Sequence, residues 1–142
     1  MYSAYINRIG KFLPGEAINN DEREEYLGKM TSRPSRVSQR SLNSKGIKQR
    51  YYAIHKQQQP LYSNSQMPAF AVRAAISQSN LEPGAIDLLV CATTLPDLLV
   101  SGFVSTVQGE LSELSPLEIV LTQGVCGGGV SALNYAPSQL EP

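Results

Sequence analysis

The sequence contains few of the residues from which disulfide-stapled or metal-bound domains are built. Among its 142 residues are two cysteines, Cys91 and Cys126, and one histidine, His55. Two cysteines do not make the framework of a small secreted disulfide domain, so we expect both to be reduced thiols. Two cysteines and a single histidine show no metal-ligand spacing either. The sequence therefore predicts neither a disulfide framework nor a metal site.

Long apolar runs are also absent, since no stretch approaches the roughly 20 apolar residues that cross a membrane. The first residues, from Met1 to Tyr5, lack the charged and apolar regions of a signal peptide. Twelve basic residues balance twelve acidic ones. A chain of this length and composition can form one modest globular core, and we expect a soluble, cytoplasmic protein that does not enter membranes.

Acidic residues are missing from one stretch, positions 30–50, which is therefore strongly basic. The basic residues in and beside it are Lys29, Arg33, Arg36, Arg40, Lys45, Lys48 and Arg50. Such a run can bind phosphate in nucleic acid or a nucleotide cofactor, can bind an acidic carrier protein, or can be a solvated surface. Residues 29–50 contain no aromatic side chain on which bases could stack, so we do not expect nucleic acid as a partner.

Hydrophobic spacing predicts alternating strands and helices. In the first half we expect a strand over 5–13, a helix from Asp21 to Gly28 with Asp21 and Glu24 as a capping pair, a helix over 34–43, a strand over 47–54 and a helix that starts at Ser65. In the second half we expect a buried strand over 85–92, a helix over 102–112 with Phe103, Val107 and Leu111 on one face, and a buried strand over 117–122. This order predicts an α/β layered domain with a mostly parallel sheet.

The sequence Gly124 to Gly129 follows the last predicted strand and places Cys126 in a glycine-rich turn before a helix. A strand-turn-helix elbow presents a side chain to the amides at the start of the next helix, which favours a thiolate nucleophile. The alternative is a small buried hydrophobic residue, which we expect for Cys91 inside its apolar strand. The turn lacks the Lys-Ser/Thr pair of a phosphate-binding loop. His55 is most simply a surface residue, and its pairing with Cys126 stays open.

Several strings, in this order, resemble the amino-terminal part of the β-ketoacyl-acyl-carrier-protein synthase III group of the thiolase superfamily. They are Ile9-Gly10 with Leu13-Pro14, Lys45-Gly46-Ile47-Lys48-Gln49-Arg50, Leu88 to Thr94, and the Cys126 elbow. The branch that makes dialkylresorcinol and aryl-polyene pigments is also similar, through Ile6 to Pro14 and Ser35-Arg36-Val37.

The resemblance implies a homodimeric acyltransferase of fatty-acid or secondary-metabolite biosynthesis, with no tightly bound cofactor. In such an enzyme Cys126 would take an acyl group from a thioester, and a malonyl-type or β-ketoacyl carbanion would then attack the acyl-enzyme. Gly124, Gly127 and Gly128 would form the turn and part of the oxyanion site. The histidine and asparagine that assist condensation in the family have no counterpart in this sequence.

The resemblance also suggests which kind of thioester donates the acyl group. Arg40 and Ser44 stand where the family often has the tryptophan and arginine that hold coenzyme A. A phosphopantetheine group or an acidic acyl carrier protein would instead suit Arg36, Arg40, Lys45 and Lys48.

The resemblance extends to about residue 136, which predicts a partial thiolase-like amino-terminal domain over 1–136 and an unrelated tail over 137–142. Pro137 should break the helix that follows Cys126. We therefore expect the isolated chain to be inactive in condensation, as the nucleophile-bearing portion of a larger enzyme. The alternative is a truncated, non-catalytic product with at most an interaction role.

Overall fold

A computed structural model describes residues 3–29, 36–98, 100, 102–114 and 116–140, and the side chains of 36–39 are outside that description. The chain divides into two compact units. The first contains Met1–Phe12 and Asn64–Pro142, and the second contains Leu13–Ser63. The hydrophobic core cluster among the described residues lies within the first unit, which agrees with the one modest core expected from the length of the chain.

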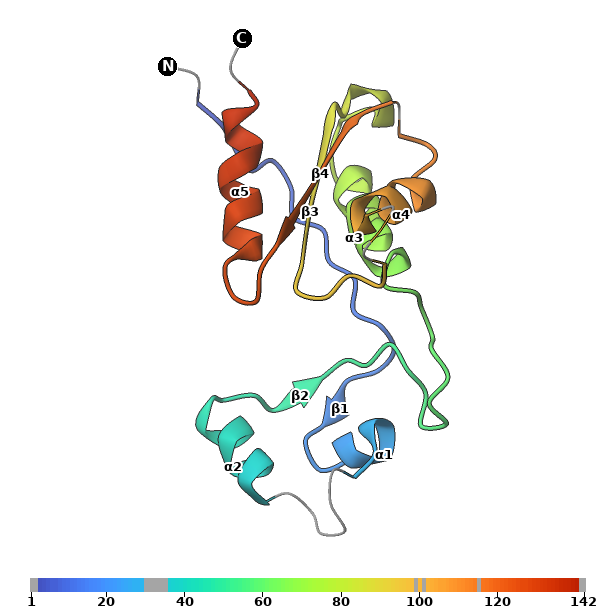
Figure 1. Cartoon of the computed structure of the whole chain (residues 1–142), viewed down its shortest axis with the longest axis vertical. Helices are drawn as coiled ribbons and strands as arrows, with labels where there is room; N and C mark the ends of the chain where they lie inside the picture. Colours follow the sequence, from blue (N-terminus) through green and yellow to red (C-terminus); the bar gives the residue numbers. More distant parts are fainter. Residues whose placement is uncertain (1–2, 30–35, 99, 101, 115, 141–142) are drawn as a thin grey trace. The chain divides into compact units, whose positions relative to one another are not determined.

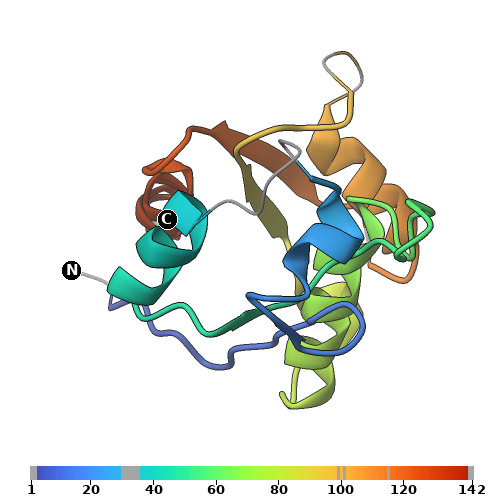
Figure 2. The same ribbon diagram turned by 90° about the horizontal axis from the view of Figure 1, so that it is seen from below.

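The first unit is built around two parallel strands, β3 (Leu88–Thr93) and β4 (Glu118–Gln123). They pair in register from Leu88 opposite Glu118 to Thr93 opposite Gln123. Helices α3 (Gln66–Ser77) and α4 (Phe103–Glu110) lie on one side of this pair, and α5 (Gly128–Ser138) lies on the other (Figures 1 and 2). The predicted α/β layering with parallel pairing is confirmed.

The core of this unit lies between the strand pair and α4. The predicted face of α4 is buried as expected, because Phe103 is 5% exposed and Val107 and Leu111 are fully buried. Ala69 of α3 and Leu89 and Cys91 of β3 pack in the same cluster. Leu89 and Cys91 of β3 point into this core, whereas their neighbours along the strand are half-buried or, at Ala92, exposed, so the strand is fully covered on one face only.

The second unit holds short elements. These are β1 (Ile18–Asn19), α1 (Arg23–Leu27), α2 (Arg36–Ser44) and β2 (Gln49–Arg50). Strands β1 and β2 pair antiparallel. The strand predicted over 47–54 is thus much shorter. Helix α1 starts after Glu22 rather than at Asp21. The Glu22 carboxylate accepts a hydrogen bond from the Asn19 amide at 3.2 Å. Gly28 ends α1 with a φ of 76°, which favours glycine.

The strand predicted over 5–13 is wrong, because no helix or strand forms between residues 3 and 14. Apolar periodicity alone does not make a strand, which also needs a partner to bond with its backbone. This segment instead runs against α3, where the Arg8 side chain donates a hydrogen bond to the Gln78 carbonyl at 2.5 Å. Gly10 comes so close to α3 that an added Cβ would lie 2.5 Å from the Ala75 amide nitrogen.

Helix α5 also differs from the prediction, because it continues past Pro137 to Ser138. A proline costs most where its ring and missing N–H interrupt the middle of a helix. Pro137 stands in the last turn, where the Gln139 amide already bonds to the Ala136 carbonyl at 3.3 Å in a tighter pattern. The expected domain boundary at residue 136 stays a prediction. Among the described residues, no helix is long and apolar enough to cross a bilayer.

Candidate active site at the turn between β4 and α5

Cys126 lies in the turn between β4 and α5, and its side chain is exposed as a free thiol. Gly127 is the N-cap of α5, and its carbonyl accepts the hydrogen bond of the Ser131 amide at 2.9 Å. The first amides of a helix have no partner within that helix and lie at the positive end of its dipole. Cys126 therefore combines solvent access with a position one residue before this amide-rich helix end.

The turn is tied to the end of the neighbouring strand. The Gly124 amide donates to the Thr93 carbonyl at 3.4 Å, which continues the pairing of β3 and β4 by one step. The Thr94 hydroxyl reaches the Val125 carbonyl at 3.5 Å. These contacts hold the residues just before Cys126 against the carboxyl end of β3.

The three glycines predicted for this turn do not have equal roles. A Cβ on Gly124 would lie 3.3 Å from the Gly128 amide nitrogen, so close approach restricts position 124 to a small residue. A Cβ on Gly128 would make ordinary contacts at 3.7 Å, and one on Gly127 would meet nothing within 4 Å. Gly127 has a φ of −102°, which other residues adopt as well. Limited space therefore explains glycine at position 124, whereas neither space nor a left-handed backbone requires glycine at 127 or 128.

Thr122 of β4 was not among the predicted site residues, although its hydroxyl contacts both the start of α5 and the neighbouring strand β3. Its hydroxyl lies 2.8 Å from the Gly128 carbonyl oxygen and 3.3 Å from the Cys91 carbonyl oxygen. The sequence signal was a threonine near the end of an apolar strand, which also fits simple β-propensity. The sequence alone cannot tell a threonine that bonds to the next helix from one that simply favours a strand. The two are distinguished only when the position of the start of α5 is known.

Cys91 occupies a contrasting environment in the middle of β3, where it is 7% exposed. Burial raises the pKa of the Cys91 thiol to about 11, because the thiolate loses its hydration. A thiol with this pKa is almost wholly protonated near neutral pH and reacts slowly. The structure thus agrees with Cys91 as a core residue.

The predicted basic residues lie in the second unit, whereas Cys126 belongs to the first. The side chains of Arg40, Lys45 and Lys48 are exposed. Arg36 begins α2, but its side chain lies outside the described residues. The basic residues and Cys126 belong to separate units, so the structure does not show them as parts of one site.

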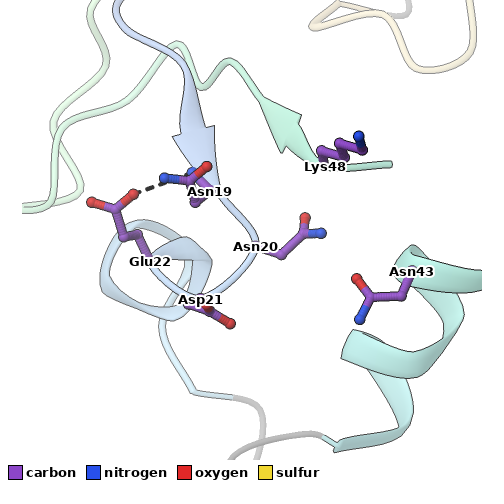
Figure 3. Close-up of a pocket in the computed structure, with 6 residues that line it drawn as sticks. All are labelled: Asn19, Asn20, Asp21, Glu22, Asn43 and Lys48. Carbon is purple, nitrogen blue, oxygen red and sulfur yellow. Dashed lines mark hydrogen bonds between the residues drawn. The ribbon is translucent and has the colours of Figure 1, made fainter. Parts of the chain in front are cut away.

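Lys48 borders a polar pocket of about 490 Å³ in the second unit. Its other lining residues are Asn19, Asn20, Asp21, Glu22 and Asn43 (Figure 3). Asn20 and Asn43 face each other across it, and the Asn20 amide donates to the Ile47 carbonyl at 2.6 Å. The carboxylates of Asp21 and Glu22 offset the positive charge of Lys48, so this pocket is not simply an anion site.

His55 is exposed in the second unit, at the bend closed by the pairing of Ile54 with Pro60. Its backbone amide donates to the Gln59 carbonyl at 2.8 Å. This agrees with the interpretation of His55 as a surface residue. Within the described part of the chain, no three or more His, Cys, Asp or Glu side chains are grouped so as to hold a metal ion.

The sequence is similar to curated β-ketoacyl-[acyl-carrier-protein] synthases III, although no family model matches it. It is 28% identical over 141 residues to the protein of Neisseria meningitidis serogroup C (strain 053442), covering 99% of this chain and 40% of the relative. It is 33% identical over 128 residues to that of Jannaschia sp. (strain CCS1), covering 90% and 36%. The chain thus spans about 40% of the length of the relatives that it matches most fully.

Solved structures share the fold. A tetronic acid condensing enzyme, AbyA1, superposes with a TM-score of 0.75 at 22% identity, covering 94% of this chain and 40% of that one. The 3-oxoacyl-[acyl-carrier-protein] synthase III of Aquifex aeolicus VF5 gives 0.69 at 23% identity, covering 92% and 38%. The resemblance found in the sequence and the thiolase-like fold class are confirmed over the part of those proteins that this chain spans.

Proposed function

We propose that this β-ketoacyl synthase III-like chain carries the acyl-accepting nucleophile of a condensing enzyme, and that Cys126 is that nucleophile. The observation that supports the assignment is the exposed Cys126 thiol at the start of α5, in a chain that resembles condensing enzymes throughout its length. Cys91, the other thiol of the chain, is buried in the core.

In the proposed reaction the Cys126 thiolate attacks the carbonyl carbon of an acyl thioester. A new carbon–sulfur bond forms, the bond to the donor sulfur breaks, and the released thiolate takes a proton from water. The carbonyl oxygen carries negative charge in the tetrahedral intermediate. Backbone amides at Cys126 and the first turn of α5, around Gly127 and Gly128, would stabilise that charge.

The assignment can be tested by incubating the 142-residue chain with an acyl thioester and measuring its mass. One acyl group should be added to the wild-type chain and none to Cys126→Ala. No lysine or arginine follows Arg73, so trypsin leaves both cysteines in one peptide. Cleavage after glutamate separates them, because Glu110 and Glu118 lie between Cys91 and Cys126. Equal labelling of wild type and Cys126→Ala would refute the assignment.

We further propose an acyl carrier protein as the donor, bound through the exposed basic residues of the second unit. The support is the exposure of Arg40, Lys45 and Lys48, and the resemblance that places Arg40 where the family often has its coenzyme A tryptophan. A charge reversal, Lys45→Glu with Lys48→Glu, should slow acylation from a carrier protein more than from coenzyme A. Lys11→Glu, an exposed lysine of the first unit, is the control. A strong preference of the wild type for coenzyme A would contradict this donor.

Condensation is the step that we do not expect from the 142 residues alone. The resemblance assigns it to a histidine and an asparagine without counterparts here, and His55 is an exposed residue of the second unit. Purified chain should therefore become acylated and release no β-ketoacyl product when a malonyl thioester is added. Turnover to such a product, measured by mass spectrometry, would show that the chain is a complete catalyst.

A further inference from the structure

We propose that Thr122 is a positioning residue for Cys126, and that its hydroxyl holds the two arms of the turn together. The inference rests on the proposed function, because it concerns how well Cys126 is placed for acyl transfer. Thr122 stands in β4, one residue before the strand ends, and Gly128 is the first residue of α5. A hydrogen bond between them closes the segment of chain that contains Cys126.

The geometry favours the bond to α5. The Thr122 hydroxyl oxygen lies 2.8 Å from the Gly128 carbonyl oxygen, an ideal distance for this kind of bond, and 3.3 Å from the Cys91 carbonyl oxygen. Both partners are acceptors, so the single hydroxyl proton is donated mainly to the nearer one. A carbonyl oxygen has two lone pairs and can accept this bond beside an intrahelical one.

Two further observations show that the turn is closed at this point. The Gly128 backbone is buried, and a Cβ on Gly124 would already lie 3.3 Å from the Gly128 nitrogen. The Gly124 amide is in turn bonded to the Thr93 carbonyl at the end of β3. Beside the turn, the Thr122 hydroxyl links the strand to the helix, whereas the contacts of Thr93 and Thr94 reach only the residues before Cys126. A second side-chain link between β4 and α5, from the Tyr135 hydroxyl to the Glu118 carboxylate at 3.4 Å, lies at the ends of the two elements away from the turn.

Loss of that link should matter more for acyl transfer than for simple thiol chemistry. Attack on a thioester requires the sulfur and the helix amides to be placed together around one carbonyl group, whereas a small alkylating reagent needs only an accessible thiol. The informative quantity is therefore the ratio of the acylation rate to the rate of alkylation by iodoacetamide at Cys126.

The test compares Thr122→Val, which keeps the shape and removes the hydroxyl, with Thr122→Ser, which keeps the hydroxyl. Thr106→Val is the matched control, because the Thr106 hydroxyl is also partly buried and donates to a carbonyl, that of Phe103 at 2.7 Å, within α4. Thr122→Val should lower the rate ratio about three- to tenfold, the range expected for one hydrogen bond. Thr122→Ser should restore most of the ratio, and Thr106→Val should leave it unchanged.

Hydrogen exchange separates failure of this inference from failure of the proposed function. Amides in the peptide from Ile119 to Glu141 should exchange faster in Thr122→Val than in wild type or Thr106→Val. If the wild type is not acylated but this difference is found, Thr122 still positions the turn and only the acyl-transfer proposal fails. If neither the rate ratio nor exchange in this peptide responds to Thr122→Val, the inference is wrong.

Discussion

The buried thiol of Cys91 should make the free energy of unfolding fall as the pH rises above about 9. Its pKa is raised from 9.0 to about 11 in the folded chain, because burial in β3 disfavours the thiolate. In the unfolded chain the same thiol ionises near its ordinary value. Between the two values the unfolded state has released a proton that the folded state retains, so rising pH favours unfolding.

The magnitude follows from the separation of the two pKa values. One pKa unit corresponds to about 1.4 kcal/mol, so the stability lost through Cys91 should reach about 1.4 kcal/mol at pH 10. Substitution Cys91→Ala removes this loss together with the thiol. It should also destabilise the chain by about 1 kcal/mol at pH 8, where the thiol is protonated in both states, because it deletes buried volume.

Urea unfolding of wild type and Cys91→Ala at pH 8 and pH 10 would measure both effects. The chain has no tryptophan, so helical circular dichroism is the suitable signal, with a reductant present to keep the thiols free. All other side chains are shared by the two proteins, so their effects cancel in the comparison. The stability advantage of wild type should shrink by about 1.4 kcal/mol between the two pH values. If the stability advantage of wild type is the same at both pH values, the Cys91 thiol is not desolvated to the extent that the structure indicates.

Two other substitutions test the packing of the first unit. Gly10→Ala should destabilise it by about 2 kcal/mol or more in urea unfolding, because the new Cβ would clash with the backbone of α3, whereas Gly109→Ala, with nothing within 4 Å of its Cβ, should be neutral or stabilising. Equal effects would disprove the close approach at Gly10. The guanidinium of Arg73, 2.6 Å from a carboxylate oxygen of Glu113, lowers the pKa of Glu113. This pair should stabilise the chain above the ordinary carboxyl pKa and lose its effect as the pH falls through the lowered value. Glu113→Gln should therefore cost less than about 1 kcal/mol at pH 7, since both side chains are well exposed, and the cost should fall as the pH drops through the lowered pKa of Glu113. A cost that does not decrease on acidification would rule out the ion pair as its cause.

Regular apolar spacing predicted the second half of the chain well. Phe103, Val107 and Leu111 recur at helical intervals, and all three are buried on the predicted face of α4. The apolar runs around Leu89 and Ile119 predicted strands, which pair in parallel. Such patterns work because one face of each element must leave water, whatever its neighbours are.

The first half was predicted less well, because its strands depend on partners that no local pattern reveals. Ile6 and Ile9 are among the apolar residues for which a strand was predicted, yet they are 75% and 79% exposed in an irregular segment. The sequence did not reveal the role of Gly10, which is to let the backbone approach α3. The division at Leu13 and Ser63 likewise reflects which segments pack together, and composition does not change at either residue.

Cys126 could be predicted as a site residue from the sequence, whereas the hydrogen bond that holds its turn could not. Cys91 pairs opposite Leu121 within the strand ladder, whereas Cys126 comes three residues after β4 ends. Position relative to the end of a strand can be read from an apolar run, and it separates a core thiol from a presented one. The hydrogen bond from Thr122 to Gly128 joins residues six apart through a turn, and it depends on the angle at which α5 leaves β4. That angle follows from how α5 packs on both strands, so the support of Cys126 could be identified only once the fold was known.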